Sequence, residues 1–236
     1  MRRKTHLILV LAAAFAASAH AGIISVNIGN TSANNNIAPG QSAGVIPATN
    51  WNNKLGSFGA AQVTDDSGTL LTTTVRVNTQ WSSGSGVPTT PDYSLMNSGT
   101  DTGGGDPFAT VSGISYDLYD VYVYIRSSSP GRFGNYSVTP SGTGAAGGGS
   151  RLGYSTAPFA GTYIEETGGQ DGNYILFEGV SGENLEIRAD PQNSPTPRAN
   201  IAGFQIVEFV PAVIPEPSSL LLVATGLFGF LIRRRR

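Results

Sequence analysis

The residue types that most often perform enzyme chemistry are missing from most of this chain. Both histidines, His6 and His20, precede Gly22, and the chain has no cysteine. A Ser-His-Asp triad, a Cys-His pair and an ordinary zinc site each need one of these two residue types. The sequence between Gly22 and Pro215 therefore excludes these three kinds of site, and the carboxylates are left as candidates for chemistry.

Glutamates are the candidates for a hydrolytic site. Glycoside hydrolysis needs two carboxylates about 5–10 Å apart across a cleft. The available side chains are Glu165, Glu166, Glu178, Glu183 and Glu186. No pattern in the sequence determines the distance between any two of them. We therefore expect that the protein is not an enzyme, with a carboxylate-based glycosidase as the alternative.

Two aspartates suggest a calcium site. Asp101 and Asp106 lie in the glycine-rich segment SGTDTGGGDP, residues 98–107. Calcium takes about six to eight oxygen ligands in flexible geometry, and carboxylates and backbone carbonyls supply them. The segment lacks the strict alternation of an EF-hand loop, so solvated turn residues are the other interpretation. Calcium is the only cofactor that the sequence suggests.

Both tryptophans are candidates for sugar binding. Trp51 is followed by Asn52 and Asn53, and Trp81 lies in the polar stretch TQWSSGSG. An aromatic ring can stack on the C–H face of a sugar while neighbouring amides bond its hydroxyls. The alternative is that each ring caps the core of the domain, where large aromatic side chains usually lie. Exposure of the rings separates these two hypotheses.

The charge balance argues against nucleic acid as a partner. Seven Lys and Arg and fifteen Asp and Glu lie between Gly22 and Pro215, so this stretch has a formal net charge of −8. Proteins that bind nucleic acid usually present a basic patch or stripe. No such cluster of Lys and Arg lies in this stretch.

The N-terminus has the three parts of a secretory signal peptide. Met1–Lys4 is basic, Leu7–Ala17 is apolar, and Ala19 and Ala21 form a small-x-small cleavage site. We predict that residues 1–21 form a signal helix that signal peptidase removes after Ala21.

The C-terminus has a second patterned segment. A turn of Pro215, Glu216 and Pro217 precedes the apolar run Leu220–Ile232, which is 13 residues long. A membrane-spanning helix needs about 20 apolar residues, so this run is short for a lasting anchor. The chain ends in four arginines, Arg233, Arg234, Arg235 and Arg236. Arginines favour the cytoplasmic side of a membrane.

This tail resembles a PEP-CTERM sorting signal. The Pro-Glu-Pro turn, the apolar helix and the arginine cluster match that pattern in order, spacing and charge over roughly the last 22 residues. The resemblance implies processing by exosortase, a membrane-embedded enzyme of Gram-negative bacteria that make exopolysaccharide. It implies a short transmembrane helix over residues 219–232, which holds the protein in the membrane transiently until the tail is removed.

The pattern of residues 22–211, which precede the tail, predicts β-strands. Gly, Ser, Thr and Asn recur, and no long stretch has helical apolar periodicity. The predicted strands are 23–28, 69–77, 119–125, 173–180, 184–189 and 201–209. In YDVYVYI, residues 119–125, the alternation places Val121 and Val123 on one face and Tyr122 and Tyr124 on the other, which is typical of a central strand covered on both faces.

Short strands separated by glycine-rich turns favour a sandwich. We predict an all-β fold with a single antiparallel β-sandwich over residues 22–211, followed by the linker and sorting signal over residues 212–236. Segments 43–53, 112–125 and 199–208 resemble segments of PEP-CTERM proteins with a galactose-binding-like jelly roll. That resemblance implies a jelly-roll topology.

Two functions remain open from the sequence. One is an exported envelope or extracellular-matrix protein, structural or adhesive in an exopolysaccharide or biofilm. The other is a carbohydrate-binding, lectin-like module on the cell surface. They differ in whether the domain has a defined pocket, with Trp51 or Trp81 exposed beside amide and carboxylate side chains.

Overall fold

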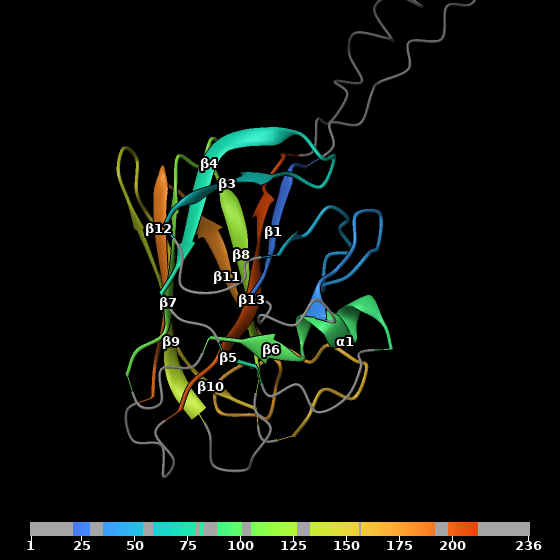
Figure 1. Ribbon diagram of the computed structural model, residues 1–236. Coiled ribbons are helices and arrows are strands. Elements are labelled where there is room, and N and C mark those ends of the chain that lie inside the picture. The colour runs from blue at the N-terminus through green and yellow to red at the C-terminus, as the bar shows by residue number, and fades with distance from the viewer. Residues whose placement is uncertain are drawn as a thin grey trace, which may run out of the picture.

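The computed structural model describes residues 21–28, 35–53, 59–78, 81–82, 89–100, 105–126, 133–155, 157–191 and 198–211. Within these residues, the strands form two large sheets packed face to face and one small two-stranded sheet (Figure 1). The predicted N-terminal signal helix and C-terminal hydrophobic helix lie outside the described residues.

The first large sheet has five strands. Their order is β11 (Tyr174–Val180), β8 (Tyr119–Ile125), β13 (Ile201–Glu208), β1 (Ile23–Asn27) and β2 (Asn52–Asn53). Neighbours pair antiparallel, except that the short β2 runs parallel to β1. The first and last long strands of the domain, β1 and β13, are therefore direct neighbours.

The second large sheet has six strands, and every neighbouring pair is antiparallel. Their order is β10 (Gly149–Tyr154), β9 (Phe133–Ser141), β12 (Asn184–Asp190), β7 (Phe108–Ser112), β4 (Leu70–Val77) and β3 (Ala61–Thr64). The glycine-rich residues 142–148 connect β9 to β10, so they are the hairpin loop that their composition indicates.

A short helix and the small sheet lie at one side of the sandwich (Figure 1). The small sheet pairs β5 (Trp81–Ser82) with β6 (Ser98–Gly99). Helix α1 (Pro91–Leu95) begins after Thr90, whose hydroxyl accepts a hydrogen bond from the Tyr93 amide. Pro91 suits the first turn because its missing amide proton would have no partner there.

The predicted all-β sandwich is confirmed, and its two packed sheets agree with a jelly-roll architecture. All six predicted strands are present, each within one residue of its expected ends. The core between the sheets is apolar. Its fully buried side chains include Val26, Val75, Val111, Val121, Val123, Val138, Ile175, Ile187, Phe204 and Ile206.

Candidate functional site

The outer face of the five-stranded sheet has a cover of its own. We define the cover as residues 35–53, helix α1 with Met96, and residues 159–163, which pack a second hydrophobic cluster onto this face. Tyr124 of β8 lies at its centre, fully buried, and its ring contacts those of Trp51 and Tyr163. Both predicted faces of β8 are therefore covered.

Trp51 belongs to this buried cluster. Its side chain is only 4% exposed, and its indole Nε1 donates to the Ala48 carbonyl at 2.9 Å. Its ring centroid lies 6.1 Å from that of Tyr124, in a tilted contact. Because the ring faces are packed inside the protein, Trp51 has no free face on which a sugar could stack.

The neighbouring asparagines hold segments of the chain together. Asn52 donates to the Ser25 and Thr64 carbonyls and accepts from the Thr64 amide. The Asn53 oxygen accepts from Asn27 and from the Ile37 amide, while its nitrogen donates to the Ile37 carbonyl. These amides are already engaged in joining β1, β3 and the cover.

The sugar-binding hypothesis therefore finds no support at Trp51, Asn52 and Asn53, where the core-capping alternative describes the packing. It stays a prediction for Trp81. The backbone of Trp81 pairs with Gly99 in the small sheet, and its side chain lies outside the described part of the structure.

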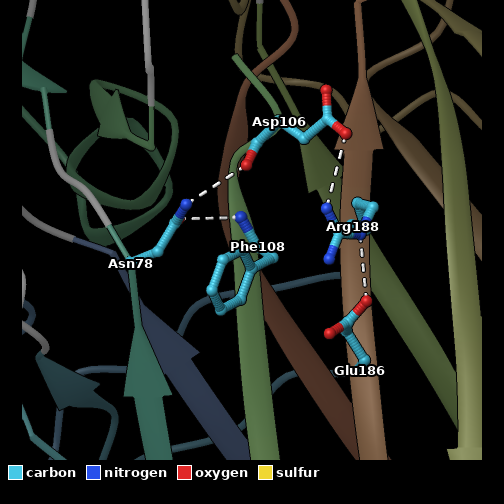
Figure 2. Close-up of polar contacts among 5 residues, drawn as sticks. All are labelled: Asn78, Asp106, Phe108, Glu186 and Arg188. Carbon is cyan, nitrogen blue, oxygen red and sulfur yellow. Dashed lines mark hydrogen bonds and ion pairs between the residues drawn. The ribbon is translucent and has the colours of Figure 1, made fainter.

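The predicted calcium ligand Asp106 forms an ion pair with an arginine. Figure 2 shows Arg188 between two carboxylates. Its Nη1 lies 3.4 Å from Asp106 Oδ2, and its Nε lies 3.0 Å from Glu186 Oε1. The hydrogen bond to Glu186 raises the pKa of the Arg188 guanidinium further above its ordinary value. The guanidinium also lies over the Phe108 ring, 5.3 Å from its centroid.

The backbone around Asp106 is held by one asparagine. The Asn78 amide nitrogen donates to the Asp106 carbonyl, and its oxygen accepts from the Phe108 amide (Figure 2). Asp101 lies outside the described residues. Among the residues that the structure describes, no group of three or more His, Cys, Asp or Glu side chains could hold a metal ion. Calcium binding stays a prediction.

The glutamates considered for hydrolysis have different surroundings. Glu166 is fully buried, and its Oε1 accepts from the backbone amides of Gly168, Gly169 and Gln170. Such a carboxylate closes a glycine-rich turn by satisfying its amides. Glu186 pairs with Arg188 as above. These two contacts are structural, and the expectation that the protein is not an enzyme stays a prediction.

A half-exposed aromatic pair lies at the edge of the cover. The rings of Tyr122 on β8 and Tyr174 on β11 have centroids 6.2 Å apart. The Tyr174 hydroxyl donates to Glu165 at 3.4 Å. Burial raises the pKa of the Tyr122 phenol. The nearby charges of Asp120, the Tyr174 phenol, Glu178 and Glu165 raise it further.

Sequence reasoning placed Tyr122 on the correct face of β8 but did not single out this pair. Tyr174 starts a strand some 50 residues later, and no local signal places it beside Tyr122. The register Leu176 opposite Tyr122 and Tyr174 opposite Tyr124 makes the two rings diagonal neighbours on one face.

Comparison with known protein families matches residues 213–236 to the PEP-CTERM protein-sorting motif. The chain carries a PEP-CTERM sorting motif. The resemblance of the tail is thereby confirmed, and the motif implies export and exosortase-mediated sorting to the cell envelope. Neither curated proteins nor solved structures gave a match.

The motif itself, with Pro215, Glu216, Pro217 and Arg233–Arg236, lies outside the described residues, as does the predicted cleavage-site residue Ala19. Within the residues that the structure describes, no helix has the length and apolar character needed to cross a membrane. The helix expected over residues 219–232 stays a prediction.

Proposed function

We propose that this protein is a structural or adhesive component of the cell envelope or extracellular matrix, in an exopolysaccharide or biofilm context. The PEP-CTERM motif at residues 213–236 is the observation that carries the proposal. The net charge of −8 between Gly22 and Pro215 supports it, because strong net charge keeps a domain soluble and monomeric in transit.

Export begins with the N-terminal segment in this proposal. Signal peptidase cuts after Ala21, and the helix over residues 219–232 then holds the chain in the membrane with Arg233–Arg236 in the cytoplasm. Exosortase acts near Pro215–Pro217 and removes the tail. The β-sandwich is released or attached outside the membrane, and it folds there without disulfides because the chain has no cysteine.

Mass spectrometry of the mature protein tests this sequence of events. In a host with an intact sorting system, we expect protein that begins at Gly22 and lacks Arg233–Arg236. Replacing Pro215, Glu216 and Pro217 by alanine should leave the arginines in place, while Pro211→Ala, a proline just before the motif, should be processed normally. Arginines retained by the wild-type protein would contradict the proposal.

The second candidate function is carbohydrate binding, and the Tyr122–Tyr174 pair is the observation that favours it. The two half-exposed rings, with Glu165 hydrogen-bonded beside them, combine an aromatic surface with carboxylate acceptors. Sugar sites use this combination because C–H faces stack on rings and hydroxyls donate to carboxylates. In this proposal the aromatic surface is provided by tyrosines on β8 and β11, not by Trp51.

Retention on a polysaccharide affinity gel tests the second candidate. Tyr174→Ala should weaken retention several-fold, because aromatic contacts are worth about 0.5–1.5 kcal/mol beyond their area. Tyr154→Ala is the matched control, since Tyr154 is also half-buried but packs against Phe133. Equal retention of both folded variants would refute carbohydrate binding at this pair, and the structural role would be the only candidate left.

A further inference from the structure

The start of β1 is held by the end of β13. The Gly22 nitrogen donates to Glu208 Oε2 at 3.1 Å, and the Gly22 carbonyl accepts from the Glu208 amide at 2.9 Å. Residue 22, the first after the predicted cleavage site, is therefore fixed on both sides of its backbone by one glutamate. In Figure 1, β1 and β13 run side by side up to this end.

The turn between β3 and β4 holds the next residue. Asp66 Oδ1 accepts from the Ile23 amide at 3.1 Å, and the Asp66 amide donates to the Ile23 carbonyl at 2.9 Å. Two carboxylates from distant parts of the chain, Glu208 and Asp66, thus accept from two consecutive backbone nitrogens at the start of the domain.

A side chain at residue 22 would collide with Tyr116. A Cβ on Gly22 would lie 2.6 Å from the Tyr116 hydroxyl and 3.0 Å from Cζ of the same ring. Side-chain carbons essentially never come that close to other heavy atoms, so a larger residue would displace the Tyr116 ring. The backbone therefore packs closely against Tyr116 at this position.

The surroundings of Gly22 and Tyr116 are acidic. Burial raises the pKa of the Tyr116 phenol, and the charges of Asp65, Glu208 and Asp66 raise it further. A phenol responds in this way when carboxylates surround it. A cation placed beside Tyr116 would be stabilised by the same three carboxylates.

We propose that Tyr116, Glu208 and Asp66 form a binding site for the α-ammonium group of Gly22, which signal peptidase creates. This inference rests on the cleavage after Ala21 in the proposed function. Hydrolysis of the Ala21–Gly22 bond consumes one water and leaves a carboxylate on Ala21 and an ammonium on Gly22. The nitrogen that donates one proton to Glu208 then carries three protons and a positive charge.

The site changes what cleavage does to the protein. Before the cut, a neutral amide faces Glu208; after it, a charge-assisted hydrogen bond forms at the same nitrogen, and such bonds are roughly twice as strong as neutral ones. Removal of the signal peptide thereby strengthens the pairing of β1 with β13. Within the site, Glu208 lies three residues before Pro211, the last residue of the predicted domain.

Amine labelling of the exported, mature protein tests the site. Between Gly22 and Pro215 the sequence has one lysine, Lys54, so the α-amine is easily resolved by mass spectrometry of the N-terminal peptide. Amine reagents attack the neutral form, and nearby carboxylates favour the charged form. We expect the native α-amine to react about tenfold more slowly than in denaturant, as one unit of pKa would produce.

Two variants separate the charge from simple burial. Glu208→Gln keeps the shape of the acceptor and should restore most of the lost reactivity, whereas Glu178→Gln, an exposed acid on β11, should react as the wild type does. If Glu208→Gln does not fold, the pH dependence of labelling in the wild type decides, because nearby carboxylates raise the pKa of the native α-amine above that in denaturant whereas burial lowers it. Equal rates in the two states, or no difference between the wild type and folded Glu208→Gln, would overturn the site.

N-terminal sequencing of the same samples distinguishes the two proposals. An uncut chain would refute the export step, and a first residue other than Gly22 would refute the predicted cleavage position and the ammonium site with it. A protein that begins at Gly22 but has an unprotected α-amine would leave export intact and refute only the ammonium site.

Discussion

The two outer faces of the sandwich are built differently. On the five-stranded sheet, β1, β8 and β13 are buried on both faces, because the cover packs aromatic rings over them. On the six-stranded sheet, β12 alternates strictly between buried and partly exposed residues, and its outer side chains include Glu186 and Arg188.

The difference shows how loops can be held on a sheet without disulfides. The cover is attached by polar groups that reach into an aromatic cluster: the Tyr124 hydroxyl accepts from the Val45 amide, and Gln205 donates to the Ile46 carbonyl. Asp92 of α1 accepts from the Gly44 amide and the Tyr163 hydroxyl. The outer face of the six-stranded sheet, which we call the open face, instead carries charges that water can solvate, and it needs no such attachment.

The largest expected effect comes from removal of the buried Trp51 ring in the cover. Trp51→Ala should lower the free energy of unfolding by about 3–5 kcal/mol, because truncation of a buried aromatic leaves a cavity. Chemical denaturation monitored by circular dichroism measures it. Loss of polysaccharide retention in this variant would therefore report unfolding and not sugar contact.

The matched substitution on the open face is Arg188→Ala. It should cost no more than about 1 kcal/mol, since its ion pairs are partly exposed to water. Similar losses for Trp51→Ala and Arg188→Ala would show that the cover contributes no more than the open face.

An effect between those of Trp51→Ala and Arg188→Ala is expected from the removal of one hydroxyl group. Tyr124→Phe keeps the ring but removes the group that accepts from Val45 and donates to Gln205. Leaving buried polar partners unsatisfied costs about 1–3 kcal/mol. Hydrogen exchange should speed up in residues 43–51 while β12 is unchanged. Uniform acceleration across both sheets would mean that the cover does not open separately.

How much of this could be read from the sequence depends on how locally each feature is encoded. The strand YDVYVYI was found, with the correct faces, because alternation of apolar and aromatic residues is visible within seven positions. The strands β9 and β10 were missed. Their sequences, FGNYSVTPS and GSRLGY, are rich in residues typical of turns, and pairing with β12 and with each other makes them strands.

The candidate sites were harder to predict because they depend on long-range packing. The stretch TNWNN looks like an exposed polar loop, yet Trp51 is buried by Tyr124, which lies 73 positions later. The Gly22–Glu208 contact joins residues 186 positions apart. Only the tail and the predicted leader, whose order and charge are contained in short segments, could be interpreted without the fold.

Alkaline titration tests the burial of the tyrosines in the cover and in the core between the sheets. Burial raises the pKa of Tyr124 and Tyr163 above the ordinary value, and it raises the pKa of Tyr119, between the sheets, to about 12. A raised folded pKa gives stability that is complete below about pH 10 and is lost as pH rises through the folded pKa. Tyrosinate absorbance should therefore rise together with unfolding above pH 10, and ionisation of all tyrosines near pH 10 in a folded protein would contradict the packing of the cover.

The smallest expected effect lies on the open face. Asp106→Asn removes one carboxylate from Arg188 and should change the free energy of unfolding by less than about 1 kcal/mol, because both side chains are near 40% exposed. The same variant tests calcium. If Asp106 serves only Arg188, adding calcium leaves the melting temperature of the wild type and the variant unchanged, whereas a calcium site with Asp101 would raise that of the wild type alone. Since Glu186 still pairs with Arg188 in the variant, a calcium-dependent difference could not come from loss of the arginine's position and would assign the carboxylate to the metal.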